Sequence, residues 1–516
     1  MGEHNLARRA EGQLERLGDF DSLFFEGTWW STGTLADRAS RLATGLIAQG
    51  VAPGDRVVVL MANCPEVTMT YTALWRAGAV ITPVIFLVSE KELRSVVTDS
   101  GAVAVVTTPE FLPKVTAAID GVDSVRFVVL AGGTGTSSVP VFDHAELSAA
   151  DPGGIVDRAD DDLAALLYTG GTTGRSKGVP LTHANLYWCG SSSQQASESN
   201  DEAEPMRNIL LPLPLAHAYG LLVTCIGMHQ TEQNQSILMR WFDAAGWVKL
   251  AEEHRVTRSA LVPSMIQMLL AQPLEQHDLS AMRAVSSGAA PLAADVRAEF
   301  ETRVPGAVVY EGYGCTESAS IISSTPLGRR RIGSVGLPVP GCEVTIRDDD
   351  DKDQPAGVDG EICVRSPGIM SGYWNSPDAT ATTVVNGWLH TGDIGHTDED
   401  GYLYVVDRKK DLIIRGGFNV YPRDVEDVLL AHPSVAMAGV VGRPDKRLGE
   451  EVVAFVSLRE GTETTPDELT AYVKERLAAN KYPREIRIVA QVPLTSVGKL
   501  DRKRLRDLVR SGQEPA

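Results

Sequence analysis

The sequence predicts an α/β protein, with a large N-terminal domain of mostly parallel sheets and flanking helices, followed by a small α+β domain. Two observations carry this prediction. Short apolar runs typical of buried strands alternate with runs of helical period over the first half of the chain, and residues 412–516 read as a compact mixture of strands and helices. A chain of 516 residues is also longer than a single hydrophobic core usually supports, so two or more domains are expected.

The first half contains elements in a regular order. A helix capped by Thr34 and ending at Gly50 is expected, because apolar residues recur between them at helical spacing. Strands then alternate with helices, which implies crossover connections. The expected strands are 57–60, 80–86, 103–107, 127–130 and 163–167, and the expected helices are 67–77 and 90–98. Two stretches, 131–138 and 191–204, are expected to be mobile connectors.

In the C-terminal stretch, strands are expected at 412–414, 435–441, 451–458 and 485–489. Pro422 opens a helix that His432 and Pro433 stop. A capping box at Thr465, with proline at the first helical position, begins a helix that runs to Ala478.

Bulk composition excludes several classes of function. The net charge of −19 argues against a duplex nucleic-acid binder, which would show a basic face. The six cysteines are scattered, without a C-x-x-C pair or zinc spacing, which favours a reducing, cytoplasmic compartment. No apolar stretch reaches the roughly 18 residues of a membrane span.

A glycine- and threonine-rich loop follows the strand at 163–167 and has the composition of a phosphate site. The stretch reads YTGGTTGRSKG from Tyr168 to Gly178. Its glycines allow close backbone approach, its hydroxyls add donors, and Lys177 adds a mobile charge. The P-loop pattern requires a hydroxyl residue after the lysine, and Gly178 stands there instead. A different phosphate chemistry is therefore expected.

A second segment, YEGYGCTES from Tyr310 to Ser318, complements the loop. It follows an expected strand at 307–310. Tyr313 could stack on a base, Thr316 could donate to a phosphate, and Glu317 could hold Mg²⁺ against phosphate oxygens. Each residue alone has a simple structural explanation, but together they supply the metal-holding carboxylate that the first loop lacks.

Two further segments could line a pocket for an organic substrate. Residues 210–222 place His217 and Tyr219 in an apolar, proline-broken stretch, although a single histidine there is more often structural than catalytic. Residues 286–292 form a small-residue backbone suited to a flat ring or a chain, with a helix entry as the alternative. Neither carries an acidic residue that would bind an ammonium group, which favours a hydrophobic ligand.

Charged residues follow in the last third of the chain. Asp393, in a Thr-Gly-Asp turn, can accept both hydroxyls of a ribose, and Arg408 could add a contact. Residues 409–411 form a charged, exposed link between two apolar blocks, as a hinge requires. Gly498 and Lys499 lie on a loop near the end of the chain, where such a pair is usually surface decoration.

Five motifs in this order resemble the adenylate-forming superfamily of acyl-CoA synthetases, peptide-synthetase adenylation domains and luciferases. They are YTGGTTGRSKG, GYGCTE, HTGDIG (390–395), DRKKDLIIRGGFNVYPRDVE (407–426) and PLTSVGKLDRKRL (493–505). The match covers nearly the whole chain. The YTGG and GGFNVYP stretches are most similar to those of fatty-acyl and other acyl-CoA ligases.

The resemblance implies a role for each matched residue. It implies an N-terminal domain over 1–408 that binds ATP and the acid, a hinge at 409–411 centred on Lys410, and a mobile C-terminal domain over 412–516. Lys499, Thr316, Glu317 and His217 are the implied catalytic group, with Glu317 as the metal ligand. His217, Tyr219, Gly288 and Ala289 are the implied acid pocket, and Gly416 and Gly417 the coenzyme A tunnel. The implied nucleotide-binding residues are Thr169, Gly170, Gly171, Thr172, Thr173, Gly174, Lys177, Gly288, Ala289, Ala290, Glu311, Gly312, Tyr313, Gly314, Asp393 and Arg408.

The implied reaction uses ATP, Mg²⁺ and coenzyme A to convert a hydrophobic carboxylic acid into an acyl-adenylate and then a thioester. An alternative enzyme would hand the acyl group to an acyl-carrier protein or stop at the adenylate. A non-enzymatic nucleotide-binding module is a third reading, and the presence of Lys177, Glu317 and Lys499 disfavours it. The sequence leaves the oligomeric state open, including a homodimer, and does not identify the acid.

Overall fold

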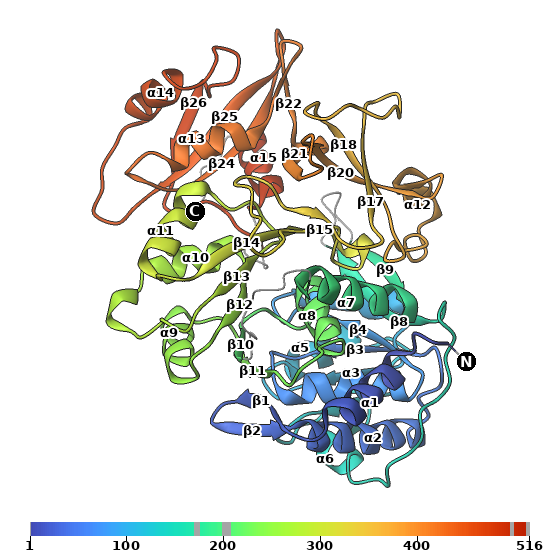
Figure 1. Ribbon diagram of the computed structural model, residues 1–516. Helices are drawn as coiled ribbons and strands as arrows, with labels where there is room; N and C mark the ends of the chain where they lie inside the picture. Colours follow the sequence, from blue (N-terminus) through green and yellow to red (C-terminus); the bar gives the residue numbers. More distant parts are fainter. Residues whose placement is uncertain (1, 170–175, 199–207, 496–499, 512–516) are drawn as a thin grey trace. The chain divides into compact units, whose positions relative to one another are not determined.

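The computed structural model describes residues 2–169, 176–198, 208–495 and 500–511 (Figure 1). The chain forms two compact units. The first comprises Met1–Ala289, Ala298–Glu343 and Val364–Leu389, and the second comprises Ala290–Arg297, Val344–Cys363 and His390–Ala516. The phosphate-loop segment and the 310–318 segment lie in the first unit, and the 390–395 and 407–426 motifs lie in the second.

A seven-stranded sheet in the first unit carries the phosphate-loop segment at its edge. In spatial order its strands are β7 (Val141–Asp143), β6 (Phe127–Leu130), β5 (Ala104–Thr107), β3 (Arg56–Leu60), β4 (Val80–Pro83), β8 (Leu163–Thr169) and β9 (Lys177–Thr182). Neighbours from β7 to β8 are parallel, and β9 is antiparallel to β8. The predicted alternation of strands and helices is therefore confirmed.

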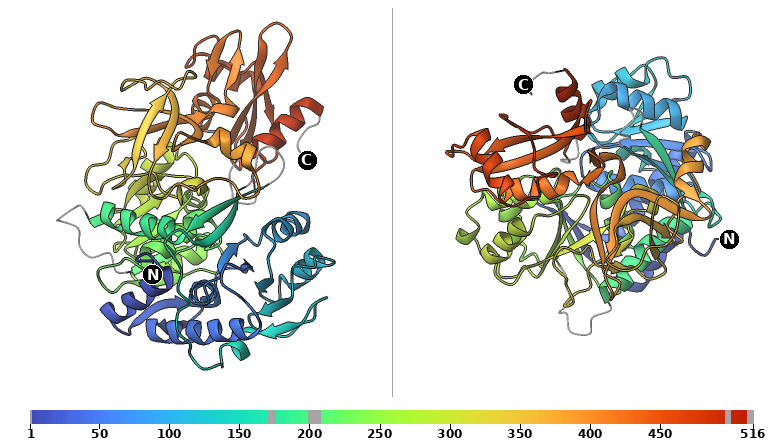
Figure 2. Two further views of the ribbon diagram at one scale, coloured as in Figure 1. Left: turned by 90° about the vertical axis from the view of Figure 1, so that its right-hand side faces the viewer. Right: turned by 90° about the horizontal axis from the view of Figure 1, so that it is seen from above.

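Helices cover both faces of this sheet because its central strands are apolar on both. Val57 and Val59 pack in one core with residues of α2 (Thr32–Ala48) and α3 (Pro65–Arg76), which lie side by side (Figures 1 and 2). Val58 and Leu60 pack in another core with residues of α4 (Glu90–Ser100) and α5 (Leu112–Ile119). The remaining helices of this region are α1 (Leu6–Leu17), α6 (His144–Leu147) and α7 (His183–Glu198).

A nine-stranded sheet carries the second candidate segment. In spatial order its strands are β16 (Leu337–Pro338), β15 (Ser323–Ser324), β14 (Val308–Tyr313), β13 (Ala284–Ser287), β12 (Arg258–Leu261), β10 (Asn208–Leu211), β11 (Gln235–Leu238), β1 (Asp21–Phe25) and β2 (Thr28–Ser31). Neighbours from β14 to β1 are parallel. The accompanying helices are α8 (Ala218–Gly227), α9 (Ala244–Glu253), α10 (Pro263–Leu270), α11 (Ala294–Arg303) and the short 3₁₀ helices η1 (Leu274–Gln276) and η2 (Thr316–Ser318). The carboxyl ends of these parallel strands thus meet at one edge, where ligands of open α/β sheets bind.

A five-stranded sheet carries the 390–395 motif. Its strands are β17 (Glu343–Arg347), β18 (Gly360–Arg365), β20 (Trp388–Thr397) and β19 (Val384–Val385), with β21 (Leu403–Arg408) paired to β20. The helix α12 (Pro377–Thr383) precedes β19. Asp393 and Arg408 are direct partners in the antiparallel β20–β21 ladder.

The C-terminal residues form the predicted α+β fold. Its sheet orders β23 (Phe418–Val420), β22 (Ile413–Arg415), β25 (Gly449–Leu458) and β24 (Val435–Asp445), with β26 (Glu485–Ile488) paired to β25. Residues of α13 (Pro422–Leu430) and α14 (Pro466–Lys474) pack on one face of this sheet, and residues of α15 (Arg502–Ser511) pack on the other. Both faces of β25 are therefore apolar and buried.

Several predicted boundaries are wrong, for local reasons. The helix cap is Ser31, whose hydroxyl accepts from the Thr34 N–H, so α2 begins before Thr34. The strand predicted to reach residue 86 ends at Pro83, since its partner β3 ends at Leu60. The capping box at Thr465 is confirmed, but its helix stops at Lys474. The connector predicted from residue 191 is helical as far as Glu198 in α7. Within the described ranges, no helix has the length and apolar character needed to cross a membrane.

Candidate functional site

The stem of the predicted phosphate loop is a β-hairpin. Thr169 at the end of β8 stands directly opposite Lys177 at the start of β9. The predicted ligands Gly170, Gly171, Thr172, Thr173 and Gly174 lie outside the described residues. The loop connects two antiparallel strands, whereas a P-loop leads from a strand into a helix. This agrees with the failed P-loop spacing in the sequence.

Tyr373 connects the phosphate loop with the predicted metal-binding carboxylate. Its hydroxyl donates to Glu317 Oε1 over 2.7 Å, and the Lys177 ammonium lies 4.6 Å from the centroid of its ring. Burial, followed by the negative charge of Glu317, raises the pKa of the Tyr373 hydroxyl, so it remains a donor. The Tyr373 side chain therefore contacts both Lys177 of the phosphate-loop segment and Glu317 of the 310–318 segment.

The segment carrying Tyr373 is fastened to the same hairpin. The Trp374 N–H donates to the Gly178 carbonyl over 2.8 Å, and the Trp374 indole donates to the Asp99 carbonyl over 3.1 Å. Tyr168 donates to the Asp99 carboxylate over 2.6 Å. A Cβ at Gly178 would lie 2.9 Å from the Trp374 Cβ, which is too close. The glycine that breaks the P-loop pattern is thus required by packing under Trp374.

Thr316 and Glu317 lie on a turn with constrained backbone. The predicted strand extends to Tyr313 in β14, so Glu311, Gly312 and Tyr313 are strand residues. A Cβ at Gly314 would approach the Ser320 carbonyl oxygen to 2.2 Å. Ala319 and Ser320 both have left-handed backbone, with φ of 49° and 80°. Such conformations persist only where surrounding contacts impose them, and they concentrate at functional sites.

Other contacts hold this turn in place. The Met370 N–H donates to the Glu317 carbonyl over 2.9 Å, and the Ser320 hydroxyl donates to the Ala218 carbonyl over 2.8 Å. The second contact joins the turn to the start of α8, where His217 and Tyr219 lie. The candidate phosphate and acid segments are therefore neighbours.

Three residues of the predicted acid pocket come together. A Cβ at Gly288 would lie 3.5 Å from Tyr219 Cε1 and 3.4 Å from the Gly312 carbonyl oxygen. The Tyr219 hydroxyl donates to the Ser286 carbonyl over 3.2 Å. Ala289, the next predicted residue, has left-handed backbone with φ of 68°. Gly288 therefore lies directly beside the Tyr219 ring and the Gly312 carbonyl, whereas Ala290 groups with the second compact unit.

His217 has a structural role in the described chain. It is the N-cap of α8, and its Nδ1 accepts from the Tyr219 N–H over 3.1 Å. Because this bond requires Nδ1 to be unprotonated, the ring's other nitrogen carries any proton. Capping of α8 therefore accounts for a histidine at this position. The predicted contact of His217 with substrate stays a prediction.

Asp393 lies in a strand and is paired with the predicted second ribose contact. It belongs to β20 and is only 6% exposed, so its placement in a turn was wrong. Gly392 beside it has φ of 71°, and the Thr391 hydroxyl accepts from the Asp393 N–H, which gives the strand its local kink. The Arg408 guanidinium contacts the Asp393 carboxylate over 3.2 Å. Arg408 therefore orients the Asp393 carboxylate, and the predicted ribose contact of these two residues stays a prediction.

The predicted hinge is a single 3₁₀ turn, η3 (Lys409–Asp411). Asp411 is buried and pairs with Arg506 over 2.8 Å, so the prediction that this whole link is exposed was wrong. Lys409 pairs with Asp349 and Glu361. Neighbouring protein atoms partly desolvate the Lys410 ammonium and Arg408 adds like charge, which together lower the pKa of Lys410 to about 8.

Gly416 and Gly417 form the two-residue turn between β22 and β23. Arg415 stands opposite Phe418, and the two glycines have φ of 60° and 82°. A two-residue hairpin with positive φ at both central positions favours glycine for conformational reasons alone. The turn therefore explains both glycines, and their predicted role as a tunnel stays a prediction.

The AMP-binding enzyme family matches residues 10–374, and the AMP-binding enzyme C-terminal domain family matches residues 424–499. The chain belongs to the AMP-binding enzyme family. This is the adenylate-forming superfamily that the five motifs indicated, and the enzyme is of its AMP-forming acid–thiol ligase type.

Relatives of this enzyme match along nearly their whole length. A feruloyl-CoA synthase of an Amycolatopsis species is 37% identical over 484 residues, which cover 92% of this chain and 93% of the relative. A long-chain-fatty-acid–CoA ligase of Bacillus subtilis is 32% identical and covers 95% and 92%. The structure of the O-succinylbenzoate coenzyme A synthetase of Bacillus subtilis, in complex with ATP and magnesium, superposes with a TM-score of 0.83 at 30% identity, covering 97% and 99%. The named acids differ between these relatives.

The described residues of this AMP-binding enzyme fit a magnesium ion bound in part by substrate phosphates. No group of three or more His, Cys, Asp or Glu side chains gathers in the described ranges, so they contain no preformed protein cage. Glu317 offers one oriented carboxylate close to the phosphate-loop lysine. Mg²⁺ commonly keeps water and phosphate ligands and takes only one or two carboxylates. The single Glu317 carboxylate suits a magnesium ion whose other ligands are phosphate oxygens and water.

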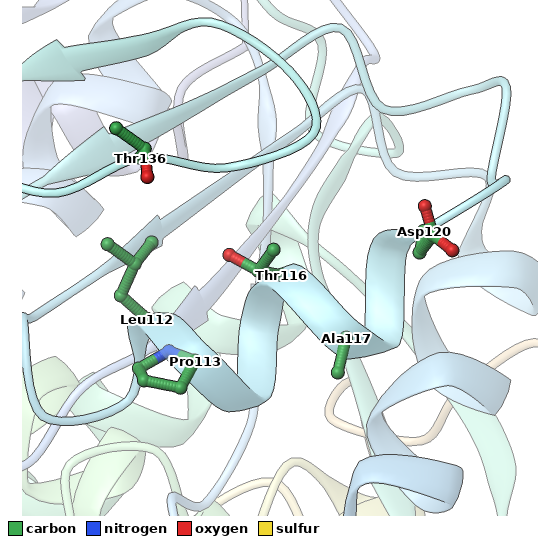
Figure 3. Close-up of a pocket in the computed structure, with 6 residues that line it drawn as sticks. All are labelled: Leu112, Pro113, Thr116, Ala117, Asp120 and Thr136. Atoms are coloured by element: carbon green, nitrogen blue, oxygen red, sulfur yellow. The ribbon is translucent and has the colours of Figure 1, made fainter.

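Two residues of the enzyme's candidate site were not predicted from the sequence. Tyr373 and Trp374 were not predicted as site residues, because an aromatic pair after a glycine is typical of ordinary packing. Lys499 lies outside the described residues. The cavity drawn in Figure 3, of about 590 Å³ along α5, is lined by none of the predicted site residues. Its lining residues are Leu112, Pro113, Thr116, Ala117, Asp120 and Thr136.

Proposed function

We propose that the enzyme uses ATP to convert a hydrophobic carboxylic acid to an acyl-adenylate, with release of pyrophosphate, and then transfers the acyl group to coenzyme A. One observation supports this most directly. Tyr373 contacts both Lys177 and Glu317. The turn that carries Glu317 also contacts the start of α8, beside Tyr219 and Gly288, through the hydrogen bond from Ser320 to Ala218. Phosphate-binding and acid-binding groups are therefore adjacent.

The first half-reaction requires positioned charge and no nucleophilic side chain. A carboxylate oxygen attacks the α-phosphorus of ATP, a new P–O bond forms, and the bond to pyrophosphate breaks. Negative charge gathers in the transition state, so donors and cations lower the barrier. We assign Lys177 to the departing phosphates, Thr316 to the α-phosphate, Glu317 to Mg²⁺ and Lys499 to the carboxylate and α-phosphate. Magnesium would neutralise phosphate charge when bound.

The second half-reaction requires a thiol to reach the adenylate carbonyl. The thiol gives its proton to solvent, its sulfur forms a bond to the carbonyl carbon, and AMP leaves with the electron pair of the broken C–O bond. We propose that residues 1–408 and 412–516 exchange faces by rotation about Lys410, and that Gly416 and Gly417 admit the pantetheine arm. Lys410→Pro should then leave adenylation intact and slow thioester formation, and unchanged turnover would refute the hinge.

The supporting evidence favours an apolar stem in the acid. The Tyr219 ring borders Gly288, and the described stretches 210–222 and 286–292 carry no acidic side chain that could bind an ammonium group. The named acids of the relatives, ferulic and long-chain fatty acids, share an apolar stem. Nothing in this pocket selects between aliphatic and aromatic stems.

The test separates the two half-reactions. Lys499→Ala should abolish acid-dependent pyrophosphate release while sparing thioester formation from supplied acyl-adenylate. Equal loss of both activities would contradict the role of Lys499. The alternative acceptor, a carrier-protein phosphopantetheine, is distinguished by comparing consumption of free coenzyme A with transfer to a carrier protein over the same panel of acids.

A further inference from the structure

The two faces of the nine-stranded sheet differ in how completely they are covered. Side chains alternate between faces along each strand. Leu210, Ser259, Val285 and Val309 are neighbours on one face and are fully buried. The α9 residue Trp247 donates to the Ser259 hydroxyl on this face over 3.1 Å. This face is therefore a closed core.

The opposite face keeps accessible surface at several neighbouring positions, although Ala284 among them is buried. The register places Arg258 opposite Ile209 and Ala284, and Ala284 opposite Val308. Ser286 and Tyr310 follow two residues further on the same face, and they are also direct partners. Of these residues Ile209, Arg258, Ser286, Val308 and Tyr310 are each only partly buried. An incompletely covered stripe thus crosses four neighbouring strands, β10, β12, β13 and β14.

Tyr219 of α8 lies over this stripe. Its hydroxyl contacts the Ser286 carbonyl, and its ring lies beside Gly288, the next residue on the same face. Burial raises the pKa of the Tyr219 hydroxyl and lowers the pKa of the Arg258 guanidinium, so protein surrounds both groups although both keep accessible surface. The stripe therefore keeps accessible surface beneath Tyr219 and beside the candidate acid pocket.

Arg258 adds a positively charged side chain to this stripe. Among the described residues it has no ion pair and no side-chain hydrogen bond, and the groups that interact with its charge are the Tyr219 and Tyr310 hydroxyls. Tyr219 already donates to Ser286. The Tyr310 hydroxyl has no hydrogen-bond partner within the same described ranges. A desolvated cation without a counter-ion is costly, and such groups are rarely found without a partner.

We propose that Arg258 and Tyr310 bind a second carboxylate at the far end of the substrate acid, so that the enzyme selects dicarboxylic acids with an apolar stem. This inference rests on the proposed function. The guanidinium offers a planar pair of donors that matches a carboxylate, and the phenol adds a third donor. The apolar residues Ile209 and Val308 lie at the level of Arg258 on the neighbouring strands, and Ala260, in register with Ser286, lies between the two ends.

The geometry also sets the length of the acid. Arg258 is in register with Ala284, four residues before Gly288 and so about 13 Å along the strand at about 3.3 Å per residue. The arginine side chain spans part of this distance. An extended dicarboxylic acid of about six to ten carbons would place one carboxylate at the Gly288–Gly312 end and the other at Arg258.

The test uses matched acids that differ only at the far end. Wild-type enzyme is assayed for pyrophosphate release with dicarboxylic acids of six to ten carbons and with the monocarboxylic acids of equal length. Wild type should prefer the dicarboxylic member at least tenfold in kcat/KM. Arg258→Met should lower kcat/KM about 100-fold for dicarboxylic acids, mainly through KM, and leave or improve turnover of monocarboxylic acids. Tyr310→Phe should show a smaller loss.

Control variants keep the result interpretable. Arg255→Met removes an exposed arginine three residues away, whose ion pair with Asp278 is 3.7 Å long, and should leave the preference unchanged. Arg258→Lys keeps the charge and should retain part of the preference even if Arg258→Met folds poorly. A wild-type preference for monocarboxylic acids, or an unchanged ratio in both Arg258 variants, would overturn the inference.

A binding measurement distinguishes failure of this inference from failure of the proposed function. The melting temperature of wild type should rise with added dicarboxylic acid, and that of Arg258→Met should not. If no acid supports pyrophosphate release but this difference persists, adenylation is wrong and the site stands. If adenylation proceeds without any dicarboxylate-dependent difference, the site is wrong and adenylation stands.

Discussion

The Tyr373 hydroxyl donates a hydrogen bond of 2.7 Å to the Glu317 carboxylate, across 56 residues of sequence. A carboxylate that binds a metal is commonly oriented by a second hydrogen-bonded group. Tyr373 also presents its ring to Lys177, so its position influences both charged residues of the candidate phosphate site.

Tyr373→Phe should therefore weaken the use of magnesium. A hydrogen bond to a charged group contributes about 1.5–3 kcal/mol, so we expect at least a tenfold loss in adenylation and a higher half-saturating magnesium concentration. The measurement is pyrophosphate release over a magnesium titration. Tyr472→Phe, which removes a distant hydroxyl contact to Ala431, is the matched control. An unchanged magnesium dependence in Tyr373→Phe would contradict this role.

Gly314→Ala should disrupt the turn that carries Thr316 and Glu317. The added Cβ would lie 2.2 Å from the Ser320 carbonyl oxygen, so the backbone must move. We expect a loss of about 2 kcal/mol in the free energy of unfolding, and loss of most adenylation activity. Chemical denaturation and pyrophosphate release measure the two effects. Gly227→Ala, where a Cβ meets nothing within 4 Å, should cost little in either.

Gly417→Asn distinguishes the turn from the tunnel. Asparagine tolerates positive φ in a two-residue hairpin turn, so the melting temperature and adenylation should change little. If the glycine also admits the pantetheine arm, thioester formation should fall at least tenfold, whereas Gly461→Asn, at another open position with positive φ, should leave it unchanged. Normal thioester formation by Gly417→Asn would reject the tunnel and leave the turn as the reason for glycine.

His183 should make the fold sensitive to acid. It is fully buried, its Nδ1 accepts from the Leu6 N–H over 3.2 Å, and burial lowers its pKa to about 4 from an unfolded value near 6.5. Because the folded value is the lower one, this stabilisation is present above pH 6.5 and is lost as the pH falls towards 4. The loss reaches about 3 kcal/mol. Chemical denaturation between pH 7.5 and 4.5 should show that the free energy of unfolding falls less steeply with decreasing pH in His183→Gln than in wild type. Parallel slopes would exclude His183 as the source.

Much of the fold was predictable from local patterns. The strand over 127–130 and the helix between Pro422 and the His432–Pro433 stop occur as expected, because apolar period, proline and capping residues act over a few positions. The errors are also local. Ser31 and Thr34 are both hydroxyl residues near the start of one helix, and only the backbone geometry decides which one caps it.

The candidate site was only partly predictable. Lys177 and Glu317 were found because phosphate and metal chemistry favours glycine, hydroxyl and carboxylate residues in short motifs. Tyr373 and Arg258 were not found, since neither belongs to such a motif. The Arg258 position depends on the register of β12 against β10 and β13, which pairs residues far apart in sequence.

The sequence by itself determined the alternating architecture, the family and the chemistry of its motifs, because those depend on residue types at short and regular spacings. Only the tertiary structure decided that Lys177 and Glu317 share Tyr373, that Gly178 must be small beneath Trp374, and that Arg258 lies on the same sheet face as Ser286. These relationships arise where strands and loops distant in the chain pack together. Burial and the lack of a charge partner are properties of that packing and cannot be assigned to a residue type alone.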